Sequence, residues 1–162
     1  MSELIKSIEA PVRLSYMVEA GIRNSRFLQA VQEGRLLGER CPDTGRVYFP
    51  PRGISPTCGE PMLEQVEVAD HGVVSTFCLI NFPFEGQLLE PPYACAHIIL
   101  DGADTPLLHI VGGCPVEDVR MGMRVKAVWK PREEREATLE NIRYFEPTGE
   151  ADAPFESYAE HL

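Results

Sequence analysis

The sequence predicts a mainly β protein with helices at its N-terminus. Six short runs of β-branched, aromatic or apolar residues follow one another from residue 62 onward, with turn residues between them. Between Leu14 and Glu33, apolar residues instead recur at spacings of three and four, as they do on one face of a helix. The stretch between these two regions carries two short turns that each hold a cysteine and a glycine. Such turns are typical of a zinc ribbon.

These patterns divide the chain into four parts. Residues 1–33 are expected to form an N-terminal arm and helices, residues 34–61 the ribbon, residues 62–146 a β-domain, and residues 147–162 a flexible acidic tail. Gly34 is expected to end the helix, because glycine readily adopts the left-handed conformation found after a last helical turn. Phe155 and Tyr158 are the residues of this tail that could serve as docking points.

The two turns of the ribbon lie at residues 41–45 and 55–59. A structural zinc site closes with four protein ligands, which a ribbon supplies as two C-x-x-C pairs. Here Thr44 and Ser55 stand where the inner cysteines would be, so Cys41 and Cys58 remain. We therefore expect no zinc and two buried thiols that face each other. Zinc held with help from Asp43 is the alternative, and a disulfide is disfavoured in a reducing compartment.

The β-domain is expected to contain short strands separated by turns. A long loop, residues 81–92, follows the second strand and holds three prolines and two phenylalanines. Loops of this length in a compact domain are usually functional or disordered. The expected strands are Leu63–Val68, Val73–Ile80, Tyr93–Leu100, Pro106–Val111, Met123–Lys130 and Ala137–Phe145.

Charge and hydropathy exclude two classes of partner. The formal net charge of -10 argues against nucleic acid, whose phosphates are bound by Lys and Arg. No run approaches the roughly 20 apolar residues of a membrane helix. The first residues also lack the basic and apolar stretches of a signal peptide. We therefore expect a cytoplasmic protein whose five cysteines are free thiols.

The run from Gly34 to Gly59, with Pro-Pro-Arg between its two turns, resembles the start of a bacterial and archaeal family of zinc-ribbon-plus-OB-fold proteins. That family was long known only as domain of unknown function thirty-five. Residues 72–76, 92–102 and 122–127 also resemble its later segments, so the resemblance covers residues 25–145. It implies a rubredoxin-like zinc-ribbon remnant followed by a five- to six-stranded OB-fold barrel.

Members of that family often accompany thiolase-like enzymes, among them thiolases, lipid-transfer-type aldolases and acyltransferases. The resemblance therefore implies a non-catalytic accessory subunit that docks on such an enzyme and helps to bind or channel acyl-CoA in lipid or steroid metabolism. The nucleophile would lie on the partner, and CoA would be the partner's ligand. The surface expected to contact the partner or acyl-CoA comprises Phe49, Pro50, Pro51, Arg52, Phe82, Phe84 and Tyr93.

Two other functions stay open. A stand-alone acyl-CoA- or lipid-binding protein would bind its ligand without a partner. A thioester hydrolase would need a cysteine with a base beside it. Cys95 and His97 share one face of a strand and could form such a pair, and Cys114 follows a double glycine in an exposed loop. For Cys95, a packed thiol beside a hydrogen-bonded histidine is the more common arrangement.

Overall fold

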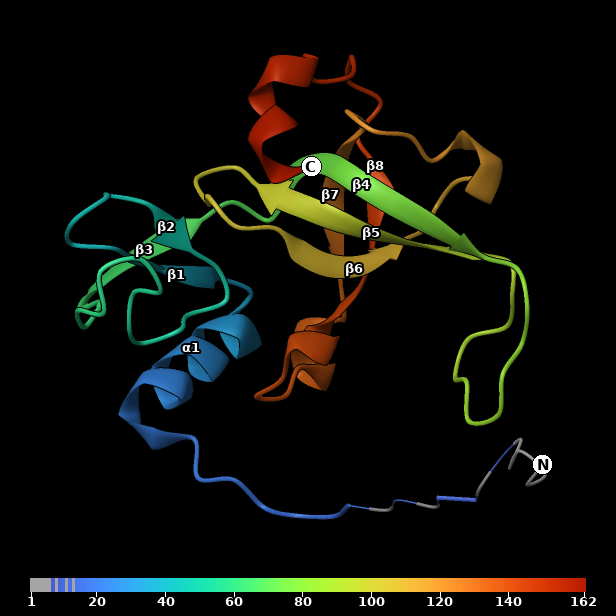
Figure 1. Cartoon of the computed structure of the whole chain (residues 1–162). Coiled ribbons are helices and arrows are strands. Elements are labelled where there is room, and N and C mark those ends of the chain that lie inside the picture. Colours follow the sequence, from blue (N-terminus) through green and yellow to red (C-terminus); the bar gives the residue numbers. More distant parts are fainter. Residues whose placement is uncertain (1–6, 8, 11, 13) are drawn as a thin grey trace, which may run out of the picture.

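The strands of the computed structural model form two groups (Figure 1), and the model describes residues 7, 9, 10, 12 and 14–162. A three-stranded sheet has the order β2-β1-β3, and a closed barrel has the order β4-β5-β6-β8-β7. The sheet consists of β1 Leu36–Arg40, β2 Val47–Tyr48 and β3 Glu64–Val68. The barrel consists of β4 His71–Ile80, β5 Tyr93–Leu100, β6 Leu107–Val111, β7 Arg124–Trp129 and β8 Ile142–Pro147. The mostly β structure, the ribbon and the barrel confirm the predicted fold class, and the five strands lie within the five to six that the family resemblance implied.

The helix α1, Gly21–Glu33, is shorter than predicted. The expected start at Leu14 was wrong, because residues 14–20 lie outside the helix and Gly21 has a φ of +68°. Gly34 ends the helix as expected, with a φ of +86° and an N–H that donates to Val31 O at 3.0 Å. The buried side of α1 packs on the ribbon, where the Phe27 and Phe49 ring centroids are 5.9 Å apart. Within the described residues, no helix has the length and apolar character needed to cross a membrane.

The strand expected to open the barrel belongs to the ribbon instead. β3 pairs along its whole length with β1, from Leu36 opposite Val68 to Arg40 opposite Glu64. The prediction of Leu63–Val68 as a barrel strand was therefore wrong, and the barrel has five strands rather than six. An alternating pattern identifies a strand but not the strand with which it pairs.

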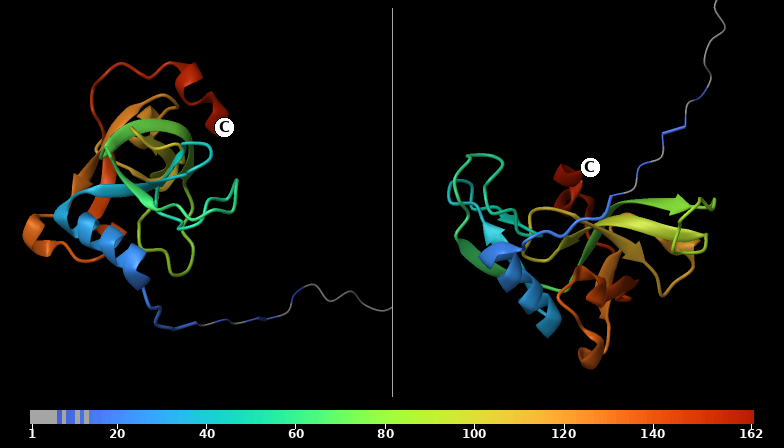
Figure 2. Two further views of the ribbon diagram at one scale, coloured as in Figure 1. Left: turned by 90° about the vertical axis from the view of Figure 1, so that its left-hand side faces the viewer. Right: turned by 90° about the horizontal axis from the view of Figure 1, so that it is seen from below.

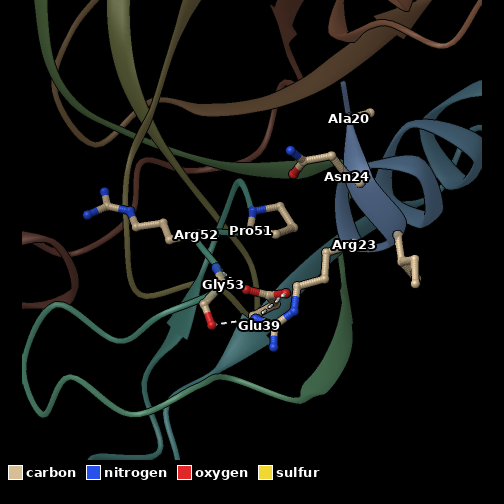
Figure 3. A pocket seen from close by; sticks show the side chains of 9 residues that line it. Ala20, Arg23, Asn24, Glu39, Pro51, Arg52 and Gly53 are labelled. Atoms are coloured by element: carbon tan, nitrogen blue, oxygen red, sulfur yellow. Dashed lines mark hydrogen bonds and ion pairs between the residues drawn. The ribbon is translucent and has the colours of Figure 1, made fainter. Parts of the chain in front are cut away.

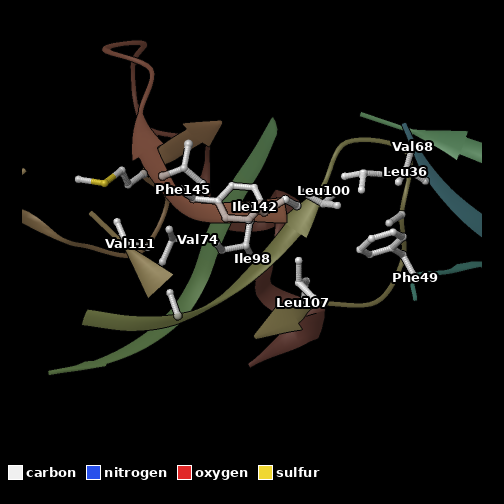
Figure 4. Packing of buried hydrophobic residues seen from close by; sticks show 14 of the residues in the cluster. Leu36, Phe49, Val68, Val74, Ile98, Leu100, Leu107, Val111, Ile142 and Phe145 are labelled. Atoms are coloured by element: carbon white, nitrogen blue, oxygen red, sulfur yellow. The ribbon is translucent and has the colours of Figure 1, made fainter. Parts of the chain in front are cut away.

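The barrel interior is filled by side chains. Val74, Ile98 and Phe145 are fully buried there, and Val125 packs with them (Figure 4). The last strand begins later than the predicted Ala137, because residues 139–141 form a short 3-10 helix. The side chain of the buried Asn141 fixes this turn by accepting from Glu136 N at 3.0 Å and donating to Glu136 O. A small barrel packed in this way has no lumen for a ligand.

The ribbon and the barrel meet at the outer edge of β2. Asp104, in the turn between β5 and β6, accepts from Val47 N at 2.7 Å and donates through its own N–H to Val47 O at 2.8 Å. Thr105 Oγ1 accepts from Phe49 N at 2.9 Å and donates to Phe49 O at 3.0 Å. The barrel turn thus satisfies backbone groups that an edge strand would otherwise leave unpaired.

The C-terminal tail folds back onto the barrel (Figure 2), so the expectation of a flexible tail was wrong. Tyr158, one of the two expected docking residues, is buried in a cluster with Val73 and Ile99. Its hydroxyl and ring lie against Gly122, where a Cβ would meet them. An ion pair between Arg46 and Glu160, 3.0 Å apart, also joins the tail to the ribbon.

We predict that Thr105→Val destabilises the protein by about 2–4 kcal/mol. The change keeps the side-chain volume but leaves the buried Phe49 N–H and C=O without partners, and each such group costs about 1–3 kcal/mol. Urea unfolding followed by circular dichroism measures the loss. Thr76→Val is the matched control, because the Thr76 hydroxyl contacts only the exposed His97, 3.3 Å away. Equal unfolding midpoints for the two variants would show that the hydrogen bonds of Thr105 to Phe49 do not stabilise the contact between ribbon and barrel.

Candidate functional site

An apolar hairpin projects from the end of the barrel that lies away from the ribbon (Figures 1 and 2). The hairpin consists of the far ends of β4 and β5 and the loop 81–92 between them; we call residues 76–95 the hairpin arm. Its pairs include Cys78 with Cys95 and Leu79 with Ala94. Its exposed apolar side chains are Phe77, Leu79, Phe82, Phe84, Leu88 and Leu89.

The arm is exposed because β4 extends beyond β7, the strand that pairs with it on the side opposite β5. β7 pairs with β4 only at His71–Val73, and the described residues supply no further strand along that edge. The edge from Thr76 to Ile80 carries no charge and no proline. Natural proteins usually protect an exposed edge with one of these devices. A register shift interrupts β4 just before this edge, between Val74 and Thr76, but from Thr76 onward the edge is uncharged and has apolar side chains on both faces, as a contact surface does.

The loop at the tip of the arm has local order. Phe84 N donates to Gln87 Oε1 at 3.0 Å, and Gln87 N donates to Phe84 O at 3.2 Å. Phe82 and Leu88 nevertheless remain 82 % and 98 % exposed. The turn therefore holds large apolar side chains in solvent instead of folding them over the barrel.

The structure does not bring the predicted contact residues together. Phe82, Phe84 and the half-buried Tyr93 lie on the hairpin arm, whereas Arg52 lies on the ribbon at the other end of the barrel (Figure 1). Phe49 is 1 % exposed and packs in the core, so its expected place on the contact surface was wrong. It follows a strand whose outer edge is covered by the barrel turn, which the sequence could not indicate.

Sequence reasoning missed Phe77 and Leu79 as surface residues. They belong to a continuous apolar run that ends at Ile80. Such a run is the usual sign of a strand buried on both faces. It is exposed here because the strand extends beyond the sheet, and only the register of β4 with its neighbours reveals that.

A second feature is an open pocket of about 430 Å³ between the start of α1 and the ribbon (Figure 3). Its floor holds the buried Glu39, whose carboxylate accepts from Gly53 N at 2.6 Å. Arg23 donates to Gly53 O and lies beside Glu39, while Arg52 points away from them. The buried carboxylate makes the pocket itself unsuitable for a phosphate. The Arg52 guanidinium is 5.4 Å from the Tyr48 ring centroid and stays exposed at the surface.

The thiols of the ribbon lie together at its tip. Cys41 Sγ is 3.8 Å from Cys58 Sγ, 3.1 Å from Ser55 Oγ and 3.7 Å from Thr57 Oγ1. Thr44 N also donates to Cys41 Sγ at 3.5 Å. Hydrogen bonds from Ser55 first, and then from Thr44, lower the pKa of the Cys41 thiol to about 6. The two thiols face each other as expected, but Cys58 is half-buried rather than buried.

These donors do not fit the zinc site that a ribbon implies. The sulfur–sulfur distance matches the edge of a tetrahedron with Zn–S bonds of about 2.3 Å. Yet the inner positions hold the neutral hydroxyls of Thr44 and Ser55, which are not among the usual zinc ligands. No group of three or more His, Cys, Asp or Glu side chains placed to hold a metal occurs in the described residues, so Asp43 does not complete the set.

The other cysteines lack the features of a nucleophile. Burial raises the pKa of Cys95, and the neighbouring Cys78 raises it further. His97 Nδ1 lies 3.3 Å from Thr76 Oγ1, and no contact joins His97 to Cys95 among the described residues. Burial also raises the pKa of Cys114, with Asp118 adding to the effect. A catalytic thiol instead needs a lowered pKa or an adjacent base.

Comparisons with known proteins agree with this architecture. Two family models match in tandem, the rubredoxin-like zinc ribbon domain of ChsH2 over residues 28–64 and its C-terminal OB-fold domain over residues 65–130. In the solved structure of an Ltp2-ChsH2(DUF35) aldolase, a chain with 27 % sequence identity aligns with a TM-score of 0.58. The alignment covers 76 % of this chain and 93 % of that one.

Two curated relatives differ in length. A probable enoyl-CoA hydratase alpha subunit of Thermomonospora curvata is 27 % identical over 106 residues, which are 65 % of this chain but 33 % of that protein. A DUF35 domain-containing scaffold protein of Methanocaldococcus jannaschii is 34 % identical over 96 residues, which are 59 % of this chain and 67 % of that protein. With the ribbon and barrel matched in order, the chain belongs to the DUF35 family.

Proposed function

We propose that the chain is a non-catalytic accessory subunit that docks on a thiolase-like enzyme. The observation that carries the proposal is the hairpin arm, whose large apolar side chains and uncharged strand edge are exposed in the isolated chain. The aligned structure bears the name of an aldolase complex that contains a DUF35 protein. Exposed apolar patches of this kind mark surfaces that bind a partner.

The arm suits insertion into a groove of a partner. It presents apolar side chains from both faces of a two-stranded ribbon, so one protein surface could enclose it. Among the described residues, the buried side-chain atom that lacks a hydrogen-bond partner is Gln87 Nε2, and it lies in the loop of this arm. The ribbon and α1 stand at the other end of the barrel and leave the arm accessible.

We further propose that the chain contacts acyl-CoA, and Arg52 is the candidate residue for this contact. The guanidinium is exposed and lies over the Tyr48 ring, and no carboxylate among the described residues pairs with it. It can therefore still pair with a phosphate oxygen. The name of the enoyl-CoA hydratase relative also links a protein of similar sequence to acyl-CoA chemistry.

The two alternative functions have less support. A lipid-binding barrel would need an interior cavity, and here Ile98, Val125 and Phe145 fill the interior. A cysteine-dependent hydrolase would need an activated thiol, whereas the pKa values of Cys95 and Cys114 are raised. The accessory role requires neither feature.

We predict that replacing Phe82, Phe84 and Leu88 by serine weakens the complex with the partner at least about 1000-fold. Each apolar side chain that becomes buried contributes about 1.5–3 kcal/mol. The measurement is isothermal titration of the chain with the thiolase-like enzyme from the same organism. Leu63→Ser is the control, because Leu63 is 79 % exposed on the ribbon, away from the arm. Unchanged affinity in the triple variant, or no binding by the wild type, would overturn the docking proposal.

We predict that Arg52→Gln leaves the assembly intact and raises the KM of the complex for acyl-CoA about tenfold. This is the cost of losing roughly one hydrogen bond to a charged group. Steady-state kinetics of the assembled enzyme measure KM, and gel filtration confirms assembly. Arg132→Gln, which removes an exposed arginine from the loop after β7, is the control. If both variants match the wild type, Arg52 does not contact the substrate.

A further inference from the structure

Two of the five cysteines meet at the ribbon tip, each held by its own turn. Gly45 N donates to Cys41 O at 3.0 Å in the first turn, and Gly59 N donates to Ser55 O at 2.9 Å in the second. The two sulfurs, 3.8 Å apart, thus come from separate, hydrogen-bonded pieces of backbone. We propose that Cys41 and Cys58 are a thiol-oxidation site that closes to a reversible disulfide across the ribbon.

The inner positions of the turns make this pairing specific. With thiols at all four positions, zinc binding and several disulfide pairings would compete. Thr44 and Ser55 replace two of those thiols by hydroxyls, so Cys41 has one sulfur beside it at the tip. The two turns that would hold zinc in a complete ribbon therefore hold one pair of thiols, Cys41 and Cys58, close together.

The two cysteines differ in exposure, which assigns them different roles. Cys58 is half-buried, whereas Cys41 is 1 % exposed. An external oxidant therefore reaches Cys58 first. Donors from Ser55, Thr57 and Thr44 surround the Cys41 sulfur and stabilise its thiolate, consistent with its lowered pKa. Cys41 is therefore the resolving cysteine: its thiolate lies 3.8 Å from Cys58 Sγ and attacks that sulfur once Cys58 has reacted with the oxidant.

The chemistry balances with glutathione disulfide as the oxidant. Cys58 loses its proton to solvent and attacks one sulfur of glutathione disulfide, which forms a mixed disulfide and releases one glutathione thiolate. Cys41 then attacks Cys58 Sγ, which forms the Cys41–Cys58 bond and releases the second glutathione thiolate. The two cysteines are oxidised by two electrons, and glutathione disulfide is reduced to two glutathione molecules.

The fold offers a second cysteine pair that serves as an internal comparison. Cys78 and Cys95 lie opposite each other on β4 and β5. Burial and the neighbouring Cys78 raise the pKa of Cys95 by more than a backbone hydrogen bond from Ala96 lowers it, and no side-chain hydroxyl donates to either sulfur among the described residues. We therefore expect oxidation to select the ribbon pair.

The test uses the full chain alone, so its outcome is independent of the docking proposal. The purified protein is equilibrated with reduced and oxidised glutathione, alkylated, and mapped by peptide mass spectrometry. Zinc is measured beforehand by elemental analysis. The expected result is loss of two alkylatable thiols, a Cys41–Cys58 peptide pair, full recovery with dithiothreitol, and substoichiometric zinc.

Single variants separate the two steps. Cys41→Ser is expected to stop as a stable glutathione adduct at Cys58, and Cys58→Ser to leave Cys41 unmodified. Cys114→Ser should behave as the wild type, because Cys114 lies on the barrel away from the ribbon. The proposal is overturned if the wild type keeps all its thiols, if the disulfide maps to Cys78–Cys95, or if stoichiometric zinc protects Cys41 and Cys58. The wild-type mapping decides even where a variant fails to fold.

Discussion

The joint at Asp104 and Thr105 fixes the positions of the two candidate sites. β2 contributes only two residues to its sheet, and its outer edge would face solvent without the barrel turn. Two side chains and one backbone N–H from that turn complete its hydrogen bonds. The ribbon, with α1 packed on it through Phe27, is thereby attached to the barrel. The hairpin arm and the ribbon tip consequently occupy opposite ends of one connected body.

Local signals in the sequence were sufficient for most elements. The spacing of Cys41 and Cys58 with their glycines identified the ribbon, and the apolar runs located the barrel strands and the long loop. Two features depended on contacts between distant residues and were missed: the pairing of β3 with β1 and the burial of Phe49. The family resemblance supplied the barrel type and the accessory role, which periodicity could not. For the proposed contact surface, the sequence composition indicated the apolar loop 81–92 but not that β4 extends beyond its neighbour β7.

The ribbon tip shows how the fold of a zinc ribbon can be stabilised by packing and hydrogen bonds in place of four metal-bound thiolates. Structural zinc contributes on the order of 10 kcal/mol in small domains. Here Cys41 packs with Tyr48, Met62 and Cys58, and hydroxyl groups bridge the two turns. Neighbouring strands and the attached barrel supply further stability. The fold therefore no longer depends on four thiolates, which leaves the two remaining sulfurs available for reactions that metal coordination would block.

The uncharged edge of β4 has a consequence for how the protein must be made. A chain that exposes Phe77, Leu79 and an open strand edge offers the same surface to every other copy of itself. Under the proposed docking role, synthesis in excess of the partner would therefore favour aggregation and clearance by the quality-control machinery. Matched synthesis of the two chains, as when neighbouring genes share one transcript, would remove that hazard. An edge that serves the proposed assembly thus places a constraint on gene dosage.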